Sequence, residues 1–284
     1  MGMRLALLTL LTMVAFAANS ILTRMAIDGA YIDPSGFAIV RVLSGAIVLG
    51  MIISIRGGSL PLMRRNRLPG AMSLTAYMIG FSLAYLTLDA GLGALILFGV
   101  VQITMFAHGA LWGAVPTRRQ VTGAAIAFVG LLFALWPGPG GAADPIGAAL
   151  MVFAGLGWAT YTIIGRASSD PLGATSANFL LSLPLMLILL AGTGLNFSAT
   201  GIALGVVCGG LTSGLGYALW YSVLPKLDGA TAAIVQLSVP IIAIFAGAVI
   251  LGEGVDLLVI LSASLVVGGI GWAVSARSLP EDHT

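Results

Sequence analysis

The side chains that could bind a solute or relay a proton are few, and they stand inside long apolar runs. Asn19, Arg41 and His108 are such groups, and Gln236 precedes Pro240 by one helical turn. A guanidinium can bind a carboxylate, and an imidazole with an unperturbed pKa of about 6.5 can relay a proton. A proline inside a helix frees a backbone carbonyl one turn earlier and permits a kink. These residue types indicate recognition of a polar group beside a helix that can bend.

Aromatic side chains accompany the polar groups at helical spacing. Asn19 and Tyr161 occupy equivalent positions in two similar segments, and Phe16 and Trp158 stand three residues before them. Residues three or four apart share one face of a helix, so each segment presents an aromatic and a polar group together. Flat aromatic walls with polar tips suit substrates that have an apolar body and a polar end. The predicted substrate-binding residues are Asn19, Arg41, Tyr77, Thr104, His108, Trp158, Tyr161 and Gln236.

Each of these candidates also has a purely structural interpretation. Asn19 could serve interhelical hydrogen bonding, and Trp158 could anchor the chain at a lipid interface. Thr104 and His108 share a helix face, where His108 could be a neutral histidine bonded to a neighbouring helix. Arg41 could extend to the outer interface instead of facing a substrate, and for Arg41 this snorkelling interpretation is the favoured one.

Other kinds of chemistry find little support. Cys208 is the single cysteine, and with His108 and His283 it cannot assemble a metal site. The chain has no Walker-type phosphate loop and no nucleophile–base pair of the kind that enzymes use. A net charge of +2, from 12 basic and 10 acidic residues, does not favour nucleic acid binding. We therefore expect no catalytic residue, no metal ion and no cofactor.

The elements that must position these residues are predicted to cross a membrane. Hydrophobic residues make up 59% of the chain and charged residues only 8%, against about 25% charged residues in soluble domains. A spanning helix needs about 20 mainly apolar residues. Ten segments meet this condition, which predicts an all-α integral membrane protein. The predicted spans are residues 5–27, 35–55, 69–88, 91–114, 119–136, 146–166, 172–193, 201–224, 229–251 and 256–276.

The distribution of Lys and Arg predicts the orientation of these spans. Cytoplasmic loops are enriched in basic residues. With the N-terminus inside, all the basic residues except Arg24 and Arg41 lie at cytoplasmic ends, which places both termini in the cytoplasm. The residues at these ends are Arg4, Arg56, Arg64, Arg65, Arg67, Arg118, Arg119, Arg166, Lys226 and Arg277.

The two halves of the chain resemble each other. The segment from Phe16 to Arg24 aligns with the segment from Trp158 to Arg166, and an Asp-Pro pair follows each of them. The predicted organisation is therefore a five-helix repeat at 1–138, a second at 144–277, and a cytoplasmic tail at 278–284. A unit with an odd number of spans inserts upside down the second time, and inverted repeats are typical of secondary transporters.

Small residues form stripes that let helices approach closely. Gly201, Gly205, Gly209 and Ser213 recur every four residues in one span, and Gly123 and Gly130 mark another. Movement between the halves would use such stripes together with a kinked helix. The predicted hinge or gating residues are Gly209, Ser213 and Pro240.

The stretch from Leu227 to Glu253 carries a family resemblance. It reads LDGATAAIVQLSVPIIAIFAGAVILGE, and it resembles the ninth helix of EamA-type members of the drug/metabolite transporter superfamily, with a mid-helix Pro240 and a terminal Glu253. In the first half Gln102 and Val115 stand at the positions of that Pro and that Glu. Glu253 could be solvated at the helix end, or it could pair with Arg24 or Arg41 and stabilise one conformational state.

The resemblance implies a multi-pass protein of the bacterial inner membrane that is similar to exporters of aromatic and other amino acids. The predicted function is export of small amphipathic metabolites, especially amino acids, by a monomeric secondary transporter with alternating access. A multidrug or cation exporter of the same superfamily is the alternative, although no acidic residue lies at the middle of a span. A membrane protein that transports nothing is the alternative from a different class.

Overall fold

The protein is described by a computed structural model, which covers residues 2–58, 60–62, 67–112, 117–135, 143–166, 168–190, 195–227 and 235–274. The predicted boundary near residues 138–144 lies partly outside the described residues, and so do the tail at 278–284 and the start of the ninth predicted span. Within the described parts the chain is almost entirely helical, and the only pairing of β type is a bridge between Ile32 and Phe197.

The helices follow one another with short connections. In chain order they are α1 (Met3–Asp28), α2 (Pro34–Ile55), α3 (Arg67–Ala84), α4 (Ala90–Leu111), α5 (Arg118–Ala134), α6 (Pro145–Arg166), α7 (Pro171–Leu189), α8 (Ala199–Val206), the π-helix η1 (Val207–Leu215), α9 (Gly216–Val223), the 3₁₀ turn η2 (Leu224–Lys226), α11 (Ser238–Ala246), the π-helix η3 (Gly247–Leu251) and α12 (Leu257–Val274).

Side-chain caps fix several helix starts. Asp33 accepts from the Gly36 N–H at 2.8 Å, and Asp170 accepts from the Gly173 N–H at 3.0 Å, so the two Asp-Pro pairs begin α2 and α7. Proline suits the first turn because its missing N–H would have no helical partner there. Thr117 opens α5 with a capping box.

Several helices have the length and composition of membrane spans. Within the described residues six helical segments qualify, and two shorter apolar helices follow near the C-terminal end. Helical residues occur within each predicted span, while the ten crossings and the cytoplasmic termini stay predictions. The six segments are Met3–Asp28, Pro34–Ile55, Ala90–Leu111, Pro145–Gly165, Pro171–Ile188 and Ala199–Lys226.

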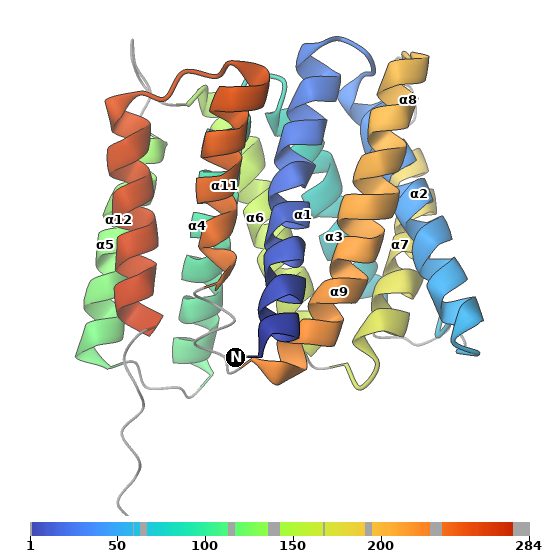
Figure 1. The fold of residues 1–284 in the computed structure, drawn as a ribbon, viewed down its shortest axis with the longest axis horizontal. Coiled ribbons are helices and arrows are strands. Elements are labelled where there is room, and N and C mark those ends of the chain that lie inside the picture. Colours follow the sequence, from blue (N-terminus) through green and yellow to red (C-terminus); the bar gives the residue numbers. More distant parts are fainter. Residues whose placement is uncertain are drawn as a thin grey trace, which may run out of the picture.

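Figure 1 shows the helices running side by side as a bundle, with α5 and α12 together at one edge and α2 near the other. Helices of the first predicted half pack mainly on helices of the second. The main pairs are α5 with α12, α3 with α6, α2 with η1, and α4 with α6. The core therefore lies between the two halves rather than inside either one.

The glycine stripes lie at these contacts. A Cβ on Gly209 would collide with the Arg41 carbonyl oxygen and the Ser44 hydroxyl, and a Cβ on Gly130 would stand 2.7 Å from the Leu265 Cβ. Helices in lipid gain stability from such close approach, because apolar lipid tails supply no hydrophobic force between them.

Candidate functional site

A cluster of hydrogen-bonded polar side chains lies where α1, α2, α3 and η1 meet. Arg41 donates from Nε to Ser213 Oγ at 3.0 Å and from Nη2 to the Tyr77 hydroxyl at 3.0 Å. The Asn19 Oδ1 accepts from Ser213 Oγ at 3.0 Å and from Thr212 Oγ1 at 2.7 Å. We call these five residues the polar cluster. Its hydrogen bonds connect elements of both predicted halves.

Arg41 is the charged member of the polar cluster, and its side chain is fully buried. The guanidinium carbon lies 5.0 Å from the ring centre of Phe81 and 5.4 Å from that of Tyr77, within the range of a cation–π interaction. Its Nη1 has no hydrogen-bond partner in the structure. The snorkelling interpretation of Arg41 is therefore wrong: Ser213 and Tyr77 hold the guanidinium inside the bundle.

The π-helix η1 brings the second half to Arg41. A π-helix forms hydrogen bonds to the fifth residue rather than the fourth, and such segments are frequent at functional sites. In η1, Gly209 packs against the backbone of α2 while Ser213 reaches Arg41. The sequence predicted a regular helix over 201–224 and missed this change, although Gly209, Gly210 and Gly214 mark the region as unusually free of side chains.

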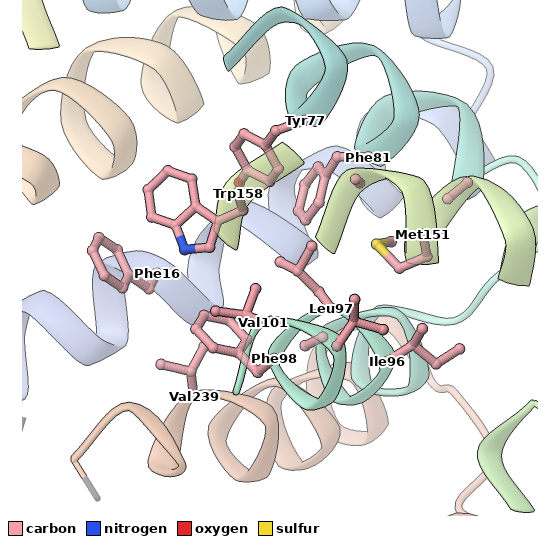
Figure 2. Close-up of a cluster of buried hydrophobic side chains, with 14 of the residues drawn as sticks. Phe16, Tyr77, Phe81, Ile96, Leu97, Phe98, Val101, Met151, Trp158 and Val239 are labelled. Atoms are coloured by element: carbon pink, nitrogen blue, oxygen red, sulfur yellow. The ribbon is translucent and has the colours of Figure 1, made fainter. Parts of the chain in front are cut away.

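Aromatic rings surround the space beside the polar cluster, and Trp158 lies among them (Figure 2). Its ring centre is 4.9 Å from that of Tyr77, 5.1 Å from that of Tyr217 and 6.3 Å from that of Phe16. The Phe16 and Tyr217 rings meet edge to face at 5.8 Å. Such pairs add about 0.5–1.5 kcal/mol each beyond the burial of their area. The alternative interpretation of Trp158, an anchor at the lipid interface, does not fit its side chain, which is buried.

These rings enclose a small cavity, which we call the central cavity. Its volume is about 10 Å³, which is room for about one water molecule. Asn19 and Tyr77 of the polar cluster contribute to its wall. Its lining residues are Phe16, Asn19, Ser20, Tyr77, Phe81, Leu97, Phe98, Trp158 and Tyr217.

A larger cavity of about 190 Å³ lies toward the end of the bundle that holds the N-terminus, and we call it the vestibule. It is bounded by α6, the start of α7, α9 and η2, with Thr162 and Tyr221 among its polar groups. Trp158 and Tyr217 line both cavities. These two rings therefore form the partition between the vestibule and the central cavity.

The opposite end of the bundle is closed by charged groups from both halves, and we call it the closed end. The Arg24 guanidinium lies 3.8 Å from Glu253 Oε1 and 3.6 Å from Asp89 Oδ1. Glu253 Oε1 also accepts from the Ala90 N–H at 2.7 Å, at the start of α4. Of the two predicted partners of Glu253, Arg24 and Arg41, the structure places Arg24 beside it.

Burial governs the ionisation of the carboxyls at the closed end. It raises the pKa of Glu253, against the lowering effects of the Ala90 hydrogen bond and the Arg24 charge. Burial likewise raises the pKa of Asp89, although Arg24 acts in the opposite direction. Both groups therefore bind a proton more readily than free carboxyls do.

A second connection closes the same end nearby. Asp33 accepts at Oδ2 from the Asn196 N–H at 2.7 Å, and the Ser198 N–H donates to the Tyr31 carbonyl at 3.0 Å. The bridge between Ile32 and Phe197 lies between these bonds. The α1–α2 connection is thus held to the segment that precedes α8.

The remaining predicted site residues lie apart from the polar cluster. Tyr161 is buried and donates to Thr175 Oγ1 at 2.9 Å. His108 is half-buried and stacks on the exposed Trp112 at 4.5 Å. Thr104, one turn before His108, is not among the residues that line either cavity.

The helix with the predicted kink is interrupted where expected. Gln236 is buried, and α11 starts two residues later at Ser238, with a turn at Leu237. Pro240 lies in the first turn of α11 and is buried. The freed carbonyl that a proline leaves one turn earlier therefore falls at this interruption. Among the described residues, no three His, Cys, Asp or Glu side chains gather where they could hold a metal ion.

Comparison with known proteins adds a family to this geometry. The model of the EamA-like transporter family matches residues 145–275. An uncharacterized protein of Pseudomonas aeruginosa is 42% identical over 283 aligned residues, which cover 96% of each chain. An uncharacterized transporter of Archaeoglobus fulgidus is 25% identical over 222 residues, or 73% of this chain and 76% of its own.

A solved crystal structure has the same fold. It is 16% identical in sequence, and the match covers 95% of this chain and 97% of the other with a TM-score of 0.65. At this identity the match establishes the arrangement of the helices alone.

Proposed function

The chain belongs to the EamA-like transporter family of the drug/metabolite transporter superfamily, and from this we propose that it is a secondary transporter of small amphipathic metabolites. Membership points to a multi-pass membrane transporter rather than an enzyme. The central cavity carries the proposal further, because it combines aromatic walls with hydrogen-bonding groups in the middle of the bundle. Its lining suits a solute with a flat apolar body and one polar end, and the rings must separate to admit that solute, since the cavity in this state has room for about one water molecule.

The two ends of the bundle support transport by alternating access. The vestibule lies on one side of the central cavity, and the closed end lies on the other. With the positive-inside orientation, the vestibule faces the cytoplasm and the closed end faces outward, as an exporter needs before it loads. The Trp158 and Tyr217 rings must separate for a solute to pass from the vestibule to the central cavity.

The contact between Phe16 and Trp158 favours an inverted repeat. These residues are 142 positions apart and occupy equivalent places in the two similar segments. Their rings nevertheless touch, at 6.3 Å between centres. Equivalent residues meet at a two-fold axis, and in inverted repeats the substrate site lies near that axis.

Aromatic amino acids are the first solutes to test, and a bacterial inner membrane is the proposed location. A cation exporter is the weaker candidate. An acidic side chain at the site would favour a bound cation, and no Asp or Glu is among the residues that line the central cavity. The polar cluster instead contains a buried guanidinium.

The deciding experiment measures flux in liposomes that contain the purified protein. Preloaded unlabelled amino acid should drive saturable uptake of the radiolabelled form, and Trp158→Ala should reduce that uptake. Gly268→Ala is the matched control, since a Cβ at Gly268 meets no atom within 4 Å. Absence of saturable flux for every amphipathic solute, with the protein folded, would reject the proposed function.

A further inference from the structure

We propose that the central site selects an organic monoanion, an aromatic carboxylate, and that Arg41 supplies the selecting charge. The inference rests on the proposed function and names its substrate class more narrowly. It starts from an imbalance in the polar cluster. Arg41 is fully buried, and the structure places no carboxylate against it in the described residues.

A buried guanidinium without an anion is energetically costly, and ionisable groups at membrane depth usually mark a solute pathway. Ser213 and Tyr77 accept from two of the Arg41 nitrogens, but both are neutral. The third nitrogen, Nη1, has no partner. An incoming carboxylate would supply the missing charge and the missing acceptor together.

Arg41 lies behind the wall of the central cavity and is not itself one of the lining residues. Arg41 donates to Tyr77 and lies over the rings of Tyr77 and Phe81, and both of these rings line the cavity. Attraction between opposite charges is strong where water is excluded. A carboxylate at this wall would place its apolar body against Trp158 and Phe16.

The α-ammonium of an amino acid has no charged partner among the lining residues. The Asn19 Oδ1 is the amide oxygen of the polar cluster, and it already accepts from Thr212, Ser213 and Cys208. The acidic groups that the structure describes near the core are those of the closed end, which bind Arg24. A carboxylate without an ammonium group is therefore the better match.

Four ligands with the same phenylethyl body test this on the unmodified chain. They are 3-phenylpropanoate, 3-phenylpropanamide, phenylalanine and 2-phenylethylamine, each titrated against the purified protein with tryptophan fluorescence as the readout. We expect 3-phenylpropanoate to bind at least tenfold more tightly than each of the other three. Equal or tighter binding of the amine or the amide would overturn the inference.

Variants of Arg41 then distinguish a role in selecting the anion from a role in folding. Arg41→Gln should abolish the preference for the anion, and Arg41→Lys should keep part of it because the charge remains. Arg119→Gln is the control, since it removes a cation that stacks on Trp272 away from the cavity. If Arg41→Gln does not fold, the ligand order on the unmodified chain and on Arg41→Lys decides.

The same measurements distinguish failure of this inference from failure of the proposed function. One outcome is that phenylalanine flux is saturable, exceeds 3-phenylpropanoate flux and persists in Arg41→Gln. That outcome would overturn anion selection and would still support a transporter. Absence of binding and flux for all four ligands, with the protein folded, would overturn anion selection, and absence of saturable flux for every other amphipathic solute as well would overturn both. Preferential flux of 3-phenylpropanoate that depends on Arg41 would support both.

Discussion

At the centre of the bundle, neutral groups alone hold a buried cation. Tyr77 and Ser213 fix the Arg41 guanidinium in place, and Asn19 fixes Ser213. Each hydrogen bond to a charged group contributes about 1.5–3 kcal/mol. These bonds orient the guanidinium without neutralising it, so its charge stays available to a solute.

Asn19→Asp tests whether the Arg41 charge is available to a solute, because the variant supplies a competing carboxylate inside the protein. It places a carboxylate one hydroxyl group away from Arg41, where it can act as an internal counter-ion. We expect a higher unfolding temperature and at least tenfold weaker binding of 3-phenylpropanoate, measured by thermal unfolding and by fluorescence titration. Asn19→Leu is the comparison, because it removes the oxygen that accepts from Thr212 and Ser213 and adds no charge. Unchanged anion binding in Asn19→Asp would argue against a role for Arg41 in selection.

The carboxyl of Glu253 predicts a pH dependence of the closed end. Burial raises its pKa in this state. The stability that the protonated carboxyl contributes is therefore fully present below the ordinary glutamate pKa of about 4.3. That contribution is lost as the pH rises through the raised pKa. Glu253→Gln keeps the oxygen that accepts from Ala90 and cannot titrate. We expect the two proteins to unfold at the same temperature near pH 4, and the wild type to be the less stable one at pH 7.

A wild type that is more stable than Glu253→Gln at pH 7 would contradict this. That result would mean that the ion pair with Arg24 outweighs the cost of burying the carboxylate. Glu253→Ala is the reference for loss of the cap. It leaves the Ala90 N–H without its acceptor and should be less stable than Glu253→Gln by about 1–3 kcal/mol at both pH values.

At the scale of the elements, the π-helix decides how closely two helices approach. η1 lies against α2, with Gly209 at the closest point and Ser213 bonded to Arg41. An ordinary helix with larger side chains would hold the two backbones further apart. The polar cluster therefore depends on a local irregularity as well as on its own residues.

Gly209→Ala should separate η1 from α2. Its Cβ would meet the Arg41 carbonyl oxygen and the Ser44 hydroxyl. Relieving the first contact requires the backbone of α2 or η1 to move, which costs more than rotating a side chain. We expect destabilisation of at least about 1–3 kcal/mol and loss of anion binding, measured by thermal unfolding and by titration. Gly268→Ala in α12 has open space and should unfold at or above the wild-type temperature. A Gly209→Ala protein with wild-type stability would show that this contact does not constrain the packing.

At the scale of the whole molecule, the two predicted halves are interleaved. Aromatic residues of both halves meet around Trp158, with Tyr77 on one side and Tyr217 on the other. Tyr77 and Tyr217 are 140 positions apart, close to the repeat shift that relates Phe16 to Trp158. A change of conformation in one half would therefore move the wall that the other half presents to the central cavity.

A cross-link at the closed end tests alternating access. Ile32 and Phe197 form an antiparallel bridge, and bridged residues have Cα atoms about 4.5–5.5 Å apart, within disulfide range. Ile32→Cys with Phe197→Cys, in a Cys208→Ser background, should form a disulfide on oxidation. We expect flux to stop when the disulfide forms and to return with a reductant, while each single cysteine variant keeps its flux. Full flux through completely cross-linked protein would mean that this part of the closed end does not open.

Composition and periodicity were sufficient for the class of protein. Apolar runs and scarce charges require helices in a membrane, because only lipid can solvate such a surface, and the family match and the apolar helices agree. The motif around Pro240 and Glu253 led to the right family. Helical spacing also placed Asn19 and Trp158 on faces that meet in the core, since each helix buries the face that its neighbours cover.

The tertiary structure decided which of these faces meet and what lies between them. It turned Arg41 inward, because Ser213 and Tyr77, 172 and 36 positions away, supply its acceptors, and it left His108 beside Trp112. It also introduced η1, whose irregular turn depends on close packing against α2. Side-chain spacing along one helix carries no information about partners on another helix, so the polar cluster became visible only when the helices were packed.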